Sequence, residues 1–432
     1  MPDLKKALLF RKGRCNMVRD DSMLVGLDIG TTKICVVVAK VSEGKVNIVG
    51  IGSHPSTGLR KGVVVNMDST VTSIKKAVEE AELMAGVKID SCVAGISGAH
   101  VKSFNSNGVV AIKDREVKAD DVARAIDAAR AVAIPADRQV LHVIPQEFII
   151  DDQDGIKDPI GITGVRLEVK VHIVTGSVSS AQNIIKCCRL AGLAVEDIVL
   201  SQIASAEATL SPEEKEIGAA LIDIGGGTSD IAVFANGSIK YTAVIPFGGN
   251  NITNDIAIGL KTPLEEAEKI KKKFGSAFAD LIGENETIEV PSVGGRKPRT
   301  LKRKVLADII EPRVEEICTM LYEEIKKSGA EKLLASGVIL TGGCANLEGI
   351  VELSENIFNL QTRVGFPTGV GGLVDVVNNP IYATGVGLLK CGYKNPGVKK
   401  QRHERGGAFR KIYKSPNINI LQKMKEWFKE IF

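Results

Sequence analysis

The pattern of apolar and polar residues changes period several times along the first hundred positions. Segments rich in apolar and β-branched residues at 46–51, 63–65 and 92–96 predict β-strands. Apolar side chains within 69–85 instead recur every three or four positions, which places them on one face of an α-helix. This alternation predicts an α/β fold that begins near residue 22.

Residues 104–182 differ in texture and predict a small α+β unit inserted into the larger fold. Short strand-like segments surround one helical pattern, and a further helix follows it. The expected strands are 108–112, 140–150 and 167–175, and the expected helices are 120–132 and 180–191.

The second half of the chain starts with a strand-rich stretch, 219–250, and continues with longer helices. Gly294 and Gly295 predict the turn of a β-hairpin within 284–304. The helical periodicity predicts helices at 263–281, 307–327, 345–353 and 379–390.

Two similar Gly-rich segments each lie between apolar runs and predict hairpins whose turns carry an aspartate and hydroxyls. Asp28 and Asp223 open these segments, 195 positions apart. Glycine and threonine permit close backbone approach and hydroxyl contact with phosphate, and a carboxylate can hold Mg²⁺ through water. We therefore expect ATP and Mg²⁺ between two related lobes, with Asp28 and Asp223 holding the Mg²⁺ ion. The expected phosphate ligands are Gly30, Thr31, Thr32, Lys33, Gly225, Gly226, Gly227 and Thr228.

A third Gly-rich turn, with Gly342, Gly343 and Asn346, follows an apolar strand and lets the backbone pass flat against a base or phosphate. Glu268 and Lys271 share one face of a predicted helix at i, i+3, where they could reach a ribose or base. Alone, this pair would indicate only an exposed helical ion pair. Together with the two hairpins it predicts an adenosine pocket.

The C-terminal end carries a separate amphipathic signal. Its apolar side chains fall on one stripe at helical period, and Lys and Glu occupy the other positions. A helix from 418 to 432 would be roughly 22 Å long, shorter than the ~30 Å hydrocarbon core, so we expect it to lie in a membrane interface. The alternative is a helix docked on the protein itself. The stripe is Ile420, Leu421, Met424, Trp427, Phe428 and Ile431.

The overall composition adds the charge of this end and little else. The chain has 432 residues and net charge +4, and from Lys394 onward it has eleven basic residues against three acidic ones. Such a tail attracts anionic lipid, while its apolar residues are not interleaved for base stacking, so we expect no nucleic-acid partner. Eight cysteines without metal spacing favour a reducing, cytoplasmic compartment.

These motifs together resemble the actin, sugar-kinase and DnaK superfamily, and within it the FtsA family of actin-like cell-division proteins. The sequence motifs that carry this resemblance include Gly95-Ile96-Ser97-Gly98-Ala99-His100, Val290-Pro291-Ser292-Val293-Gly294-Gly295-Arg296 and Ile310-Glu311-Pro312-Arg313. The resemblance implies an actin-like two-lobed ATPase fold with an inserted α+β subdomain and a C-terminal amphipathic helix on a flexible linker.

The resemblance also implies partners. FtsA-like proteins tether the tubulin homologue FtsZ at the cytoplasmic face of the membrane at the division site, form head-to-tail filaments and contact other division proteins through the inserted subdomain. They receive the acidic C-terminal peptide of FtsZ, a role that we carry over to Arg296 and Arg313.

One segment departs from the family pattern. Where related chains read Glu/Gln-Pro, this chain reads Leu200-Ser201-Gln202-Ile203-Ala204, so Ser201 or Gln202 would orient an attacking water. We assign the catalytic roles to Asp28, Asp223 and Gln202. Because this orienting group governs hydrolysis, we expect ATP binding with weak or no ATPase activity.

Three other functions fit the superfamily less well. A metabolite kinase needs an Asp base over its substrate, a DnaK-type chaperone needs a β-rich domain after residue 390, and a pilus-assembly protein should lack the terminal helix. The expected division of the chain is an N-terminal extension (1–21), a first lobe (22–103, 183–218 and closing helix 371–392), the inserted subdomain (104–182), a second lobe (219–254 and 329–370), a partner-binding subdomain (255–328), a basic linker (393–415) and a membrane helix (416–432).

Overall fold

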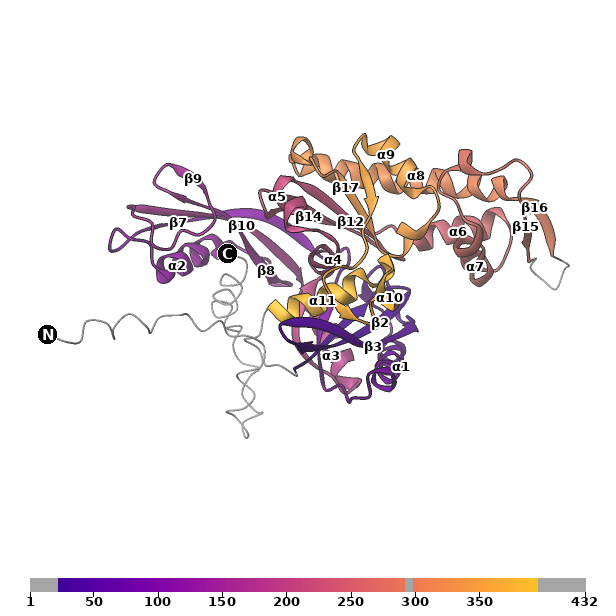
Figure 1. Ribbon diagram of the computed structural model, residues 1–432, viewed down its shortest axis with the longest axis horizontal. Coiled ribbons are helices and arrows are strands. Elements are labelled where there is room, and N and C mark those ends of the chain that lie inside the picture. The colour runs from indigo at the N-terminus through magenta and orange to yellow at the C-terminus, as the bar shows by residue number, and fades with distance from the viewer. Residues whose placement is uncertain (1–21, 292–297, 395–432) are drawn as a thin grey trace.

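Two lobes and a smaller attached sheet form the molecule in the computed structural model, which describes residues 22–291 and 298–394 (Figure 1). In these residues, no helix combines the length and apolarity that crossing a membrane requires. The expected terminal helix and extension 1–21 lie outside the described residues, as does the expected linker except for residues 393 and 394, which belong to helix α11 (Ala383–Lys394).

The first lobe is built on a six-stranded sheet in the order β11-β6-β1-β2-β3-β19. Its strands pair in mixed fashion, since β1 is antiparallel to β2 but parallel to β6. A short hairpin, β4 and β5, follows β3. The strands are β1 (Met23–Ile29), β2 (Lys33–Ser42), β3 (Lys45–Pro55), β4 (Leu59–Arg60), β5 (Val63–Val64), β6 (Ser91–Ile96), β11 (Ala194–Leu200) and β19 (Gly371–Gly372).

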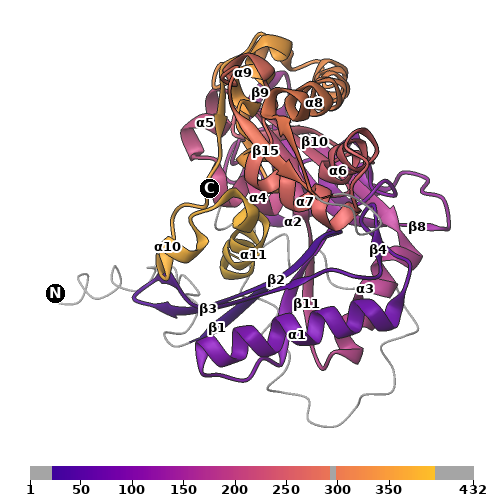
Figure 2. The same ribbon diagram turned by 90° about the vertical axis from the view of Figure 1, so that its right-hand side faces the viewer.

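Helices cover both faces of this sheet, as Figure 2 shows for α1 below it and α11 above it. Helix α1 (Met67–Ala85) begins where the Asn66 side chain accepts from the Ser69 amide, and it ends at Gly86, whose φ of 67° favours glycine. Helix α3 (Val178–Leu190) shares the α1 face through a common apolar core. On the other face lie α4 (Ser201–Thr209) and α11 (Ala383–Lys394).

The inserted unit is a four-stranded sheet in the order β7-β10-β8-β9 with α2 packed on it. It projects from the body beside the second lobe (Figure 1). Side chains from it bond to that lobe: Ser103 donates to the Thr242 carbonyl and His172 contacts the Thr242 hydroxyl. The elements are β7 (Lys102–Ala111), α2 (Ala119–Arg130), β8 (Arg138–Ile150), β9 (Gln153–Ile156) and β10 (Arg166–Ser177).

The second lobe repeats the plan with a five-stranded sheet in the order β14-β13-β12-β17-β18. Its largest apolar core lies between this sheet and the helices that follow it. The strands are β12 (Ala219–Ile224), β13 (Ser229–Ala235), β14 (Ser238–Ile245), β17 (Val338–Thr341) and β18 (Thr362–Val364). The helices are α5 (Pro212–Ile217), α6 (Gly249–Gly259), α7 (Leu264–Phe274), α8 (Arg303–Lys327) and α9 (Ile350–Phe358).

Two predicted helices are corrected by the structure. The helix predicted at 263–281 ends at Phe274, because Gly275 is extended, and only a 3-10 turn, η1 (Ala279–Leu281), follows. The helix predicted at 345–353 is instead the 3-10 turn η3 (Gly343–Asn346) and then α9. Strands β15 (Thr287–Val290) and β16 (Arg299–Lys302) pair as the predicted hairpin.

Candidate nucleotide cleft

Each predicted phosphate segment forms the turn of a β-hairpin, which confirms the strand–turn–strand prediction. In the first, β1 pairs with β2 and the Gly30 amide donates to the Lys33 carbonyl at 3.0 Å. In the second, β12 pairs with β13 and the Gly225 amide donates to the Thr228 carbonyl at 2.9 Å. The two lobes thus contribute the same local structure to the cleft between them.

The turns of the two hairpins lie directly against each other. A Cβ atom at Gly226 would stand 2.3 Å from the Thr32 side chain, and one at Gly227 would stand 2.7 Å from that of Thr31. A larger residue at either position would therefore collide with a threonine of the first hairpin. These glycines and threonines, predicted as phosphate ligands, do meet in one place.

Asp28 and Asp223 lie at the base of this contact and influence each other. Burial raises the pKa of Asp28 to about 6, with Asp223 adding to the rise and Lys33 opposing it. Burial also raises the pKa of Asp223, although two hydroxyls bond to it: Ser205 at 2.7 Å and Thr384 at 3.1 Å. The first lobe thus holds the carboxylate of the second in position.

A third carboxylate, Asp230, was missed by the sequence analysis. It pairs with Asp223 across the second hairpin, and like charges directly opposite on neighbouring strands repel. Burial and then the Asp223 charge raise the pKa of Asp230 to about 7, against hydrogen bonds from Ser97 and Thr228. Because Ser97 belongs to the first lobe, this bond joins the lobes at the base of the cleft.

Lys33, predicted as a phosphate ligand, faces the cleft from the start of β2. Its Nζ donates to the Ile381 carbonyl at 2.6 Å and lies 4.5 Å from the centroid of the Tyr382 ring. Both residues belong to η4 (Pro380–Tyr382), the turn before α11. Lys33 therefore ties the first hairpin to the turn before α11, and its charge partly opposes the rise that burial causes in the pKa of Asp28 and of Asp223.

The third Gly-rich turn reaches the same place from the second lobe. Gly342 has a φ of 84°, and a Cβ atom there would stand 2.3 Å from an Asp223 oxygen. A Cβ at Gly249, at the start of α6, would stand 2.7 Å from the Cys344 sulfur and 3.2 Å from Lys271 Nζ. The third turn and the start of α6 therefore pack closely, with glycine at both points of closest approach, and we call this glycine-lined convergence the cradle.

Glu268 and Lys271 form an ion pair at 2.7 Å beside this cradle. Lys271 also donates to the Gly249 carbonyl at 3.0 Å, and Thr253 donates to Glu268. Burial raises the pKa of Glu268, but the Lys271 charge and these bonds outweigh it, so the pKa is lowered. The pair is thus built into the cleft wall beside the third turn.

The remaining predicted residues are placed less directly. Asn346 donates to Asn379 at 3.0 Å, outside the hairpin contact. Gln202 is fully buried, and its amide nitrogen donates to the Ala243 carbonyl at 3.3 Å. Its Oε1 has no hydrogen-bond partner among the described residues. An orphaned buried oxygen of this kind suits a bound water.

The donor set fits Mg²⁺ only with help from phosphate and water. No group of three or more His, Cys, Asp or Glu side chains among residues 22–291 and 298–394 could hold a metal. Mg²⁺ needs six oxygens in near-ideal geometry and keeps several waters. Asp28 and Asp223 would therefore hold it through water, with phosphate oxygens supplying direct ligands.

The expected partner residues are distributed differently. Arg313 donates to Asp255 and to Glu316, so its charge is already paired. Arg296 lies outside the described residues, as do the six stripe residues Ile420, Leu421, Met424, Trp427, Phe428 and Ile431.

Comparison with known families identifies two segments. The profile described as "Cell division protein FtsA" matches residues 220–387, and the profile described as "SHS2 domain inserted in FTSA" matches residues 98–175. The second match coincides with β7, α2, β8, β9 and β10. Solved structures with a similar fold include a PilM-PilN type IV pilus biogenesis complex, with 17% identity, a TM-score of 0.63, and coverage of 86% of this chain and 99% of that one.

A second similar structure is MreB5 of Spiroplasma citri bound to ADP, with 15% identity, a TM-score of 0.54, and coverage of 88% of this chain and 99% of that one. These likenesses confirm the predicted actin-like ATPase fold. Among curated relatives, Cell division protein FtsA of Pseudomonas aeruginosa is 51% identical, with 95% of this chain and 98% of the relative covered. That of Escherichia coli is 40% identical, with coverage of 96% and 99%. The chain therefore belongs to the FtsA family of cell division proteins.

Proposed function

We propose that this chain is an ATP-binding adaptor that tethers FtsZ filaments to the cytoplasmic face of the membrane during division. The observation that carries the nucleotide part is the contact between the two hairpin turns, with Asp28 and Asp223 beneath them. A triphosphate lying against both turns would touch both lobes at once, so its presence would set the angle between them.

In this proposal, bound nucleotide acts mainly by setting the conformation of the two lobes, and its hydrolysis is secondary. The related structure of MreB5 is described as bound to ADP, which supports a nucleotide in the matching cleft. When bound with ATP, Mg²⁺ would neutralise phosphate charge. Gln202 offers only a buried Oε1, with its amide nitrogen held by Ala243, so we expect slow hydrolysis.

The partner surface proposed for the FtsZ peptide lies where α6 meets α8. A Cβ at Gly259 would stand 2.7 Å from Ile309, so these helices are in close contact. Beside that contact Ile258 is 75% exposed and Val305 is 42% exposed. Lys302 and Lys304 are exposed and form no ion pair among the described residues. Apolar side chains flanked by free lysines suit an acidic peptide with apolar anchors.

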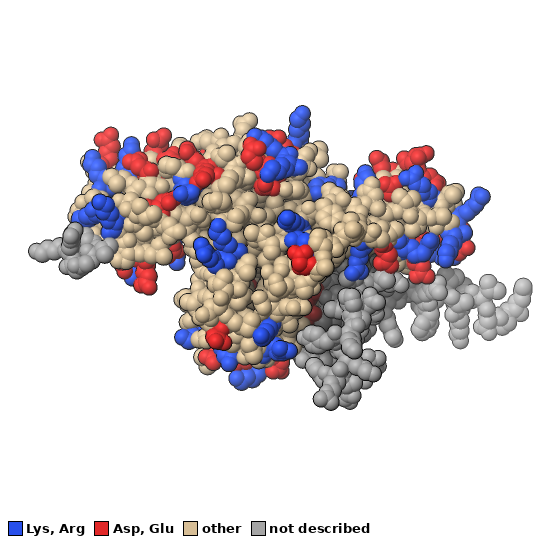
Figure 3. Space-filling view, turned by 180° about the vertical axis from the view of Figure 1, so that it is seen from behind, with Lys and Arg blue, Asp and Glu red and all other residues tan. Residues whose placement is uncertain are grey.

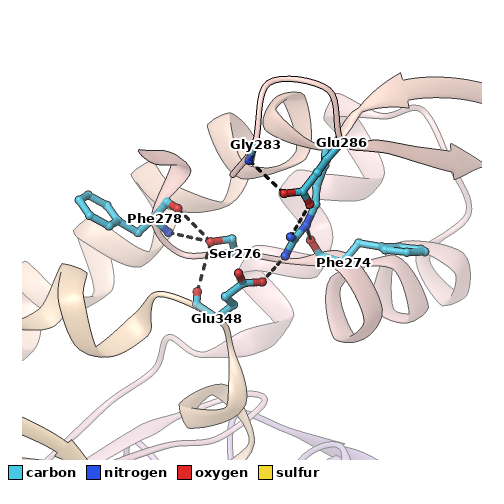
Figure 4. A network of polar contacts seen from close by, with 7 residues as sticks. Phe274, Ser276, Phe278, Gly283, Glu286 and Glu348 are labelled. Atoms are coloured by element: carbon cyan, nitrogen blue, oxygen red, sulfur yellow. Dashed lines mark hydrogen bonds and ion pairs between the residues drawn. The ribbon is translucent and has the colours of Figure 1, made fainter. Parts of the chain in front are cut away.

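A polar network holds this surface to the nucleotide lobe (Figure 4). Arg303 donates to the Phe274 carbonyl and to Glu286, both at 2.8 Å, and also to Glu348. Its side chain is only 15% exposed. Since Arg303 is the first residue of α8, the start of the proposed peptide surface is fixed to the end of α7 and to the loop after η3.

The free lysines of this surface replace Arg313 as the main candidates for peptide binding. Arg313 would have to exchange Asp255 for a peptide carboxylate, which would leave Asp255 unpaired. Arg296 lies outside the described residues and keeps its place in the proposal on sequence grounds alone.

The membrane part rests on the sequence of residues 416–432. One apolar stripe with a Trp and a Phe, on a helix too short to span, favours interfacial binding, and the basic residues upstream add attraction of about 1 kcal/mol each to anionic lipid. Head-to-tail self-assembly and contacts of the inserted subdomain with other division proteins complete the proposal.

Liposome co-sedimentation tests these parts together, using the full chain, vesicles with and without anionic lipid, ATP, and purified FtsZ. We expect the chain to pellet with anionic vesicles and to carry FtsZ with it. A chain that lacks 416–432 should stay in the supernatant but should still bind ATP when measured by calorimetry. Asp223→Asn should pellet with the vesicles but should lose ATP binding. Pelleting that persists without the terminal segment would refute the membrane assignment. Unchanged ATP affinity of Asp223→Asn would refute the cleft assignment.

A further inference from the structure

A pocket of about 200 Å³ lies beside the two hairpin turns, between the lobes. Thr31 and Gly227, one from each turn, belong to its lining. The rest of the lining is the β4–β5 hairpin of the first lobe and the start of α6 in the second: Leu59, Arg60, Lys61, Asn250, Asn251 and Asn254. These last six residues belong neither to the phosphate segments nor to the third turn predicted from the sequence.

Each wall of the pocket is attached to one phosphate hairpin. On the first-lobe side, the Gly62 amide donates to the Thr31 hydroxyl at 3.1 Å, so the β4–β5 turn moves with the first hairpin. On the second-lobe side, the Asn250 amide donates to the Gly226 carbonyl at 2.7 Å, so α6 moves with the second. The width of the pocket therefore follows the separation of the hairpins.

The charge of the pocket is positive and unneutralised. Arg60 and Lys61 are both exposed, and neither forms an ion pair within residues 22–291 and 298–394. Lys61 Nζ lies 5.6 Å from the centroid of the Phe247 ring, which belongs to the second lobe. A cation over an aromatic face is held more weakly than one bonded to a phosphate oxygen. Lys61 can therefore exchange Phe247 for an anion without leaving a carboxylate unpaired.

The backbone at Lys61 is held in an uncommon conformation. Its φ of 49° lies in the left-handed region, where a residue with a Cβ is strained. The adjacent Gly62 cannot be enlarged, because a Cβ there would stand 2.8 Å from the Ser97 carbonyl. The turn is thus fixed against the loop that carries Ser97, and Lys61 is presented toward the cleft.

Asn250 and Asn254 supply neutral donors on the opposite wall. They are four residues apart, so they lie on the same face of α6. The first amides of α6 are already bonded to the second hairpin, with Gly249 donating to Gly225 at 2.9 Å. Side chains, and not the helix terminus, must therefore hold any anion in the pocket. In the view from behind (Figure 3), Lys and Arg side chains lie on the surface near the junction of the lobes.

We propose that Lys61 binds the terminal phosphate of a nucleoside triphosphate and thereby distinguishes ATP from ADP. This inference rests on the proposed nucleotide cleft and adds to it a ligand outside the two hairpins and the third turn. In this proposal a terminal phosphate held in the pocket would bridge Lys61 on the first lobe to Asn250 and Asn254 on the second. ADP lacks the terminal phosphate. With ADP bound, Lys61 therefore keeps its contact with the Phe247 ring, and no ligand group links the two walls of the pocket.

The test compares the Mg²⁺ complexes of AMPPNP and ADP by titration calorimetry on the full chain. Lys61→Met should weaken AMPPNP roughly tenfold to a hundredfold, the range expected for one lost charged hydrogen bond, and change ADP affinity less than threefold. Lys61→Arg should keep most of the preference for AMPPNP. Lys76→Met is the matched control, since Lys76 is an exposed first-lobe lysine on α1, and it should leave both affinities unchanged.

Several outcomes would overturn the inference. Equal weakening of both nucleotides would place Lys61 elsewhere on the nucleotide, and unchanged AMPPNP affinity would remove Lys61 from the site, in both cases with the proposed cleft intact. If the wild-type chain binds neither nucleotide, the proposed function fails and the inference fails with it. The melting temperature of each free variant checks its folding, and Lys61→Gln replaces Lys61→Met if that variant unfolds.

Discussion

Replacing Asp230 by asparagine should make the folded chain more stable at pH 8. Asp230 is only 5% exposed and stands opposite Asp223, and its pKa rises from the usual 3.8 to about 7. A group that holds its proton more tightly when folded stabilises the folded state at low pH, and this stabilisation is lost as the pH rises toward 7. Asparagine has nearly the same shape, keeps an acceptor for the Ser97 hydroxyl and carries no charge.

The magnitude follows from the two pKa values. At about 1.36 kcal/mol per pH unit, the difference between 3.8 and about 7 amounts to roughly 4 kcal/mol of lost stability above pH 7. Because burial dominates this rise and asparagine is also polar, we expect Asp230→Asn to recover about 2 to 4 kcal/mol at pH 8. Between pH 5.5 and 7, the wild type should lose roughly 2 kcal/mol more than the variant.

Urea unfolding at pH 5.5, 7 and 8 measures both quantities through the midpoint and the slope. Asp152→Asn is the control, because Asp152 is exposed on the inserted subdomain and its removal should change neither stability nor its pH dependence. Asp28, whose pKa is about 6, titrates in both proteins, and its charge also raises the pKa of Asp230, so the difference between the two proteins measures Asp230 together with this coupling. If Asp230→Asn has the same pH dependence as the wild type, the carboxylate is not buried against Asp223 as described.

Two further substitutions test how α4 is held by α5 and α11. Glu207 lies between Lys215 and Lys394, each at 2.5 Å, and although burial raises its pKa, the two lysines lower it to about 2. That stabilisation is present above pH 4.5 and is lost toward pH 2. Glu207→Gln should therefore lower the unfolding free energy by about 2 to 3 kcal/mol at pH 7 and by little at pH 2. Equal losses at both pH values would contradict the assignment of this stabilisation to the two ion pairs. A Cβ at Gly387 would stand 1.7 Å from the Ala204 carbonyl, so Gly387→Ala should cost about 1 to 3 kcal/mol, and an unchanged melting temperature in scanning calorimetry would show that α11 does not pack on α4 this closely.

The sequence predicted the parts of the cleft whose signals are local. Each hairpin was evident because its Gly-rich turn stands between two apolar runs, and the Glu268–Lys271 pair was evident from helical spacing. The overlong helix at 263–281 has a local cause as well. Apolar side chains continue at helical spacing past Phe274, and only the extended conformation of Gly275 ends the helix.

Residues that act through distant partners could not be predicted in the same way. Asp223 receives its hydroxyls from Ser205 and from Thr384, 161 positions later in the chain. Asp230 carried a weak signal, since it follows Thr228 by two positions in the predicted hairpin, but its bond to Ser97 spans 133 positions. Arg313 illustrates the opposite case, because its charge suggested a free cation until Asp255, 58 positions earlier, was placed beside it.

The position of α11 has a consequence for how the chain folds. This helix packs against β1, where a Cβ at Gly26 would stand 2.6 Å from the Gly385 carbonyl. The helix that covers the first strand of the sheet therefore lies more than 350 residues later in the chain. The sheet of the second lobe, by contrast, is made from one continuous stretch, 219–364. During synthesis the second lobe can therefore complete its core while the first still exposes one apolar face. Closing so long a loop is slow, and we expect docking of α11 to be the last step that makes the cleft whole.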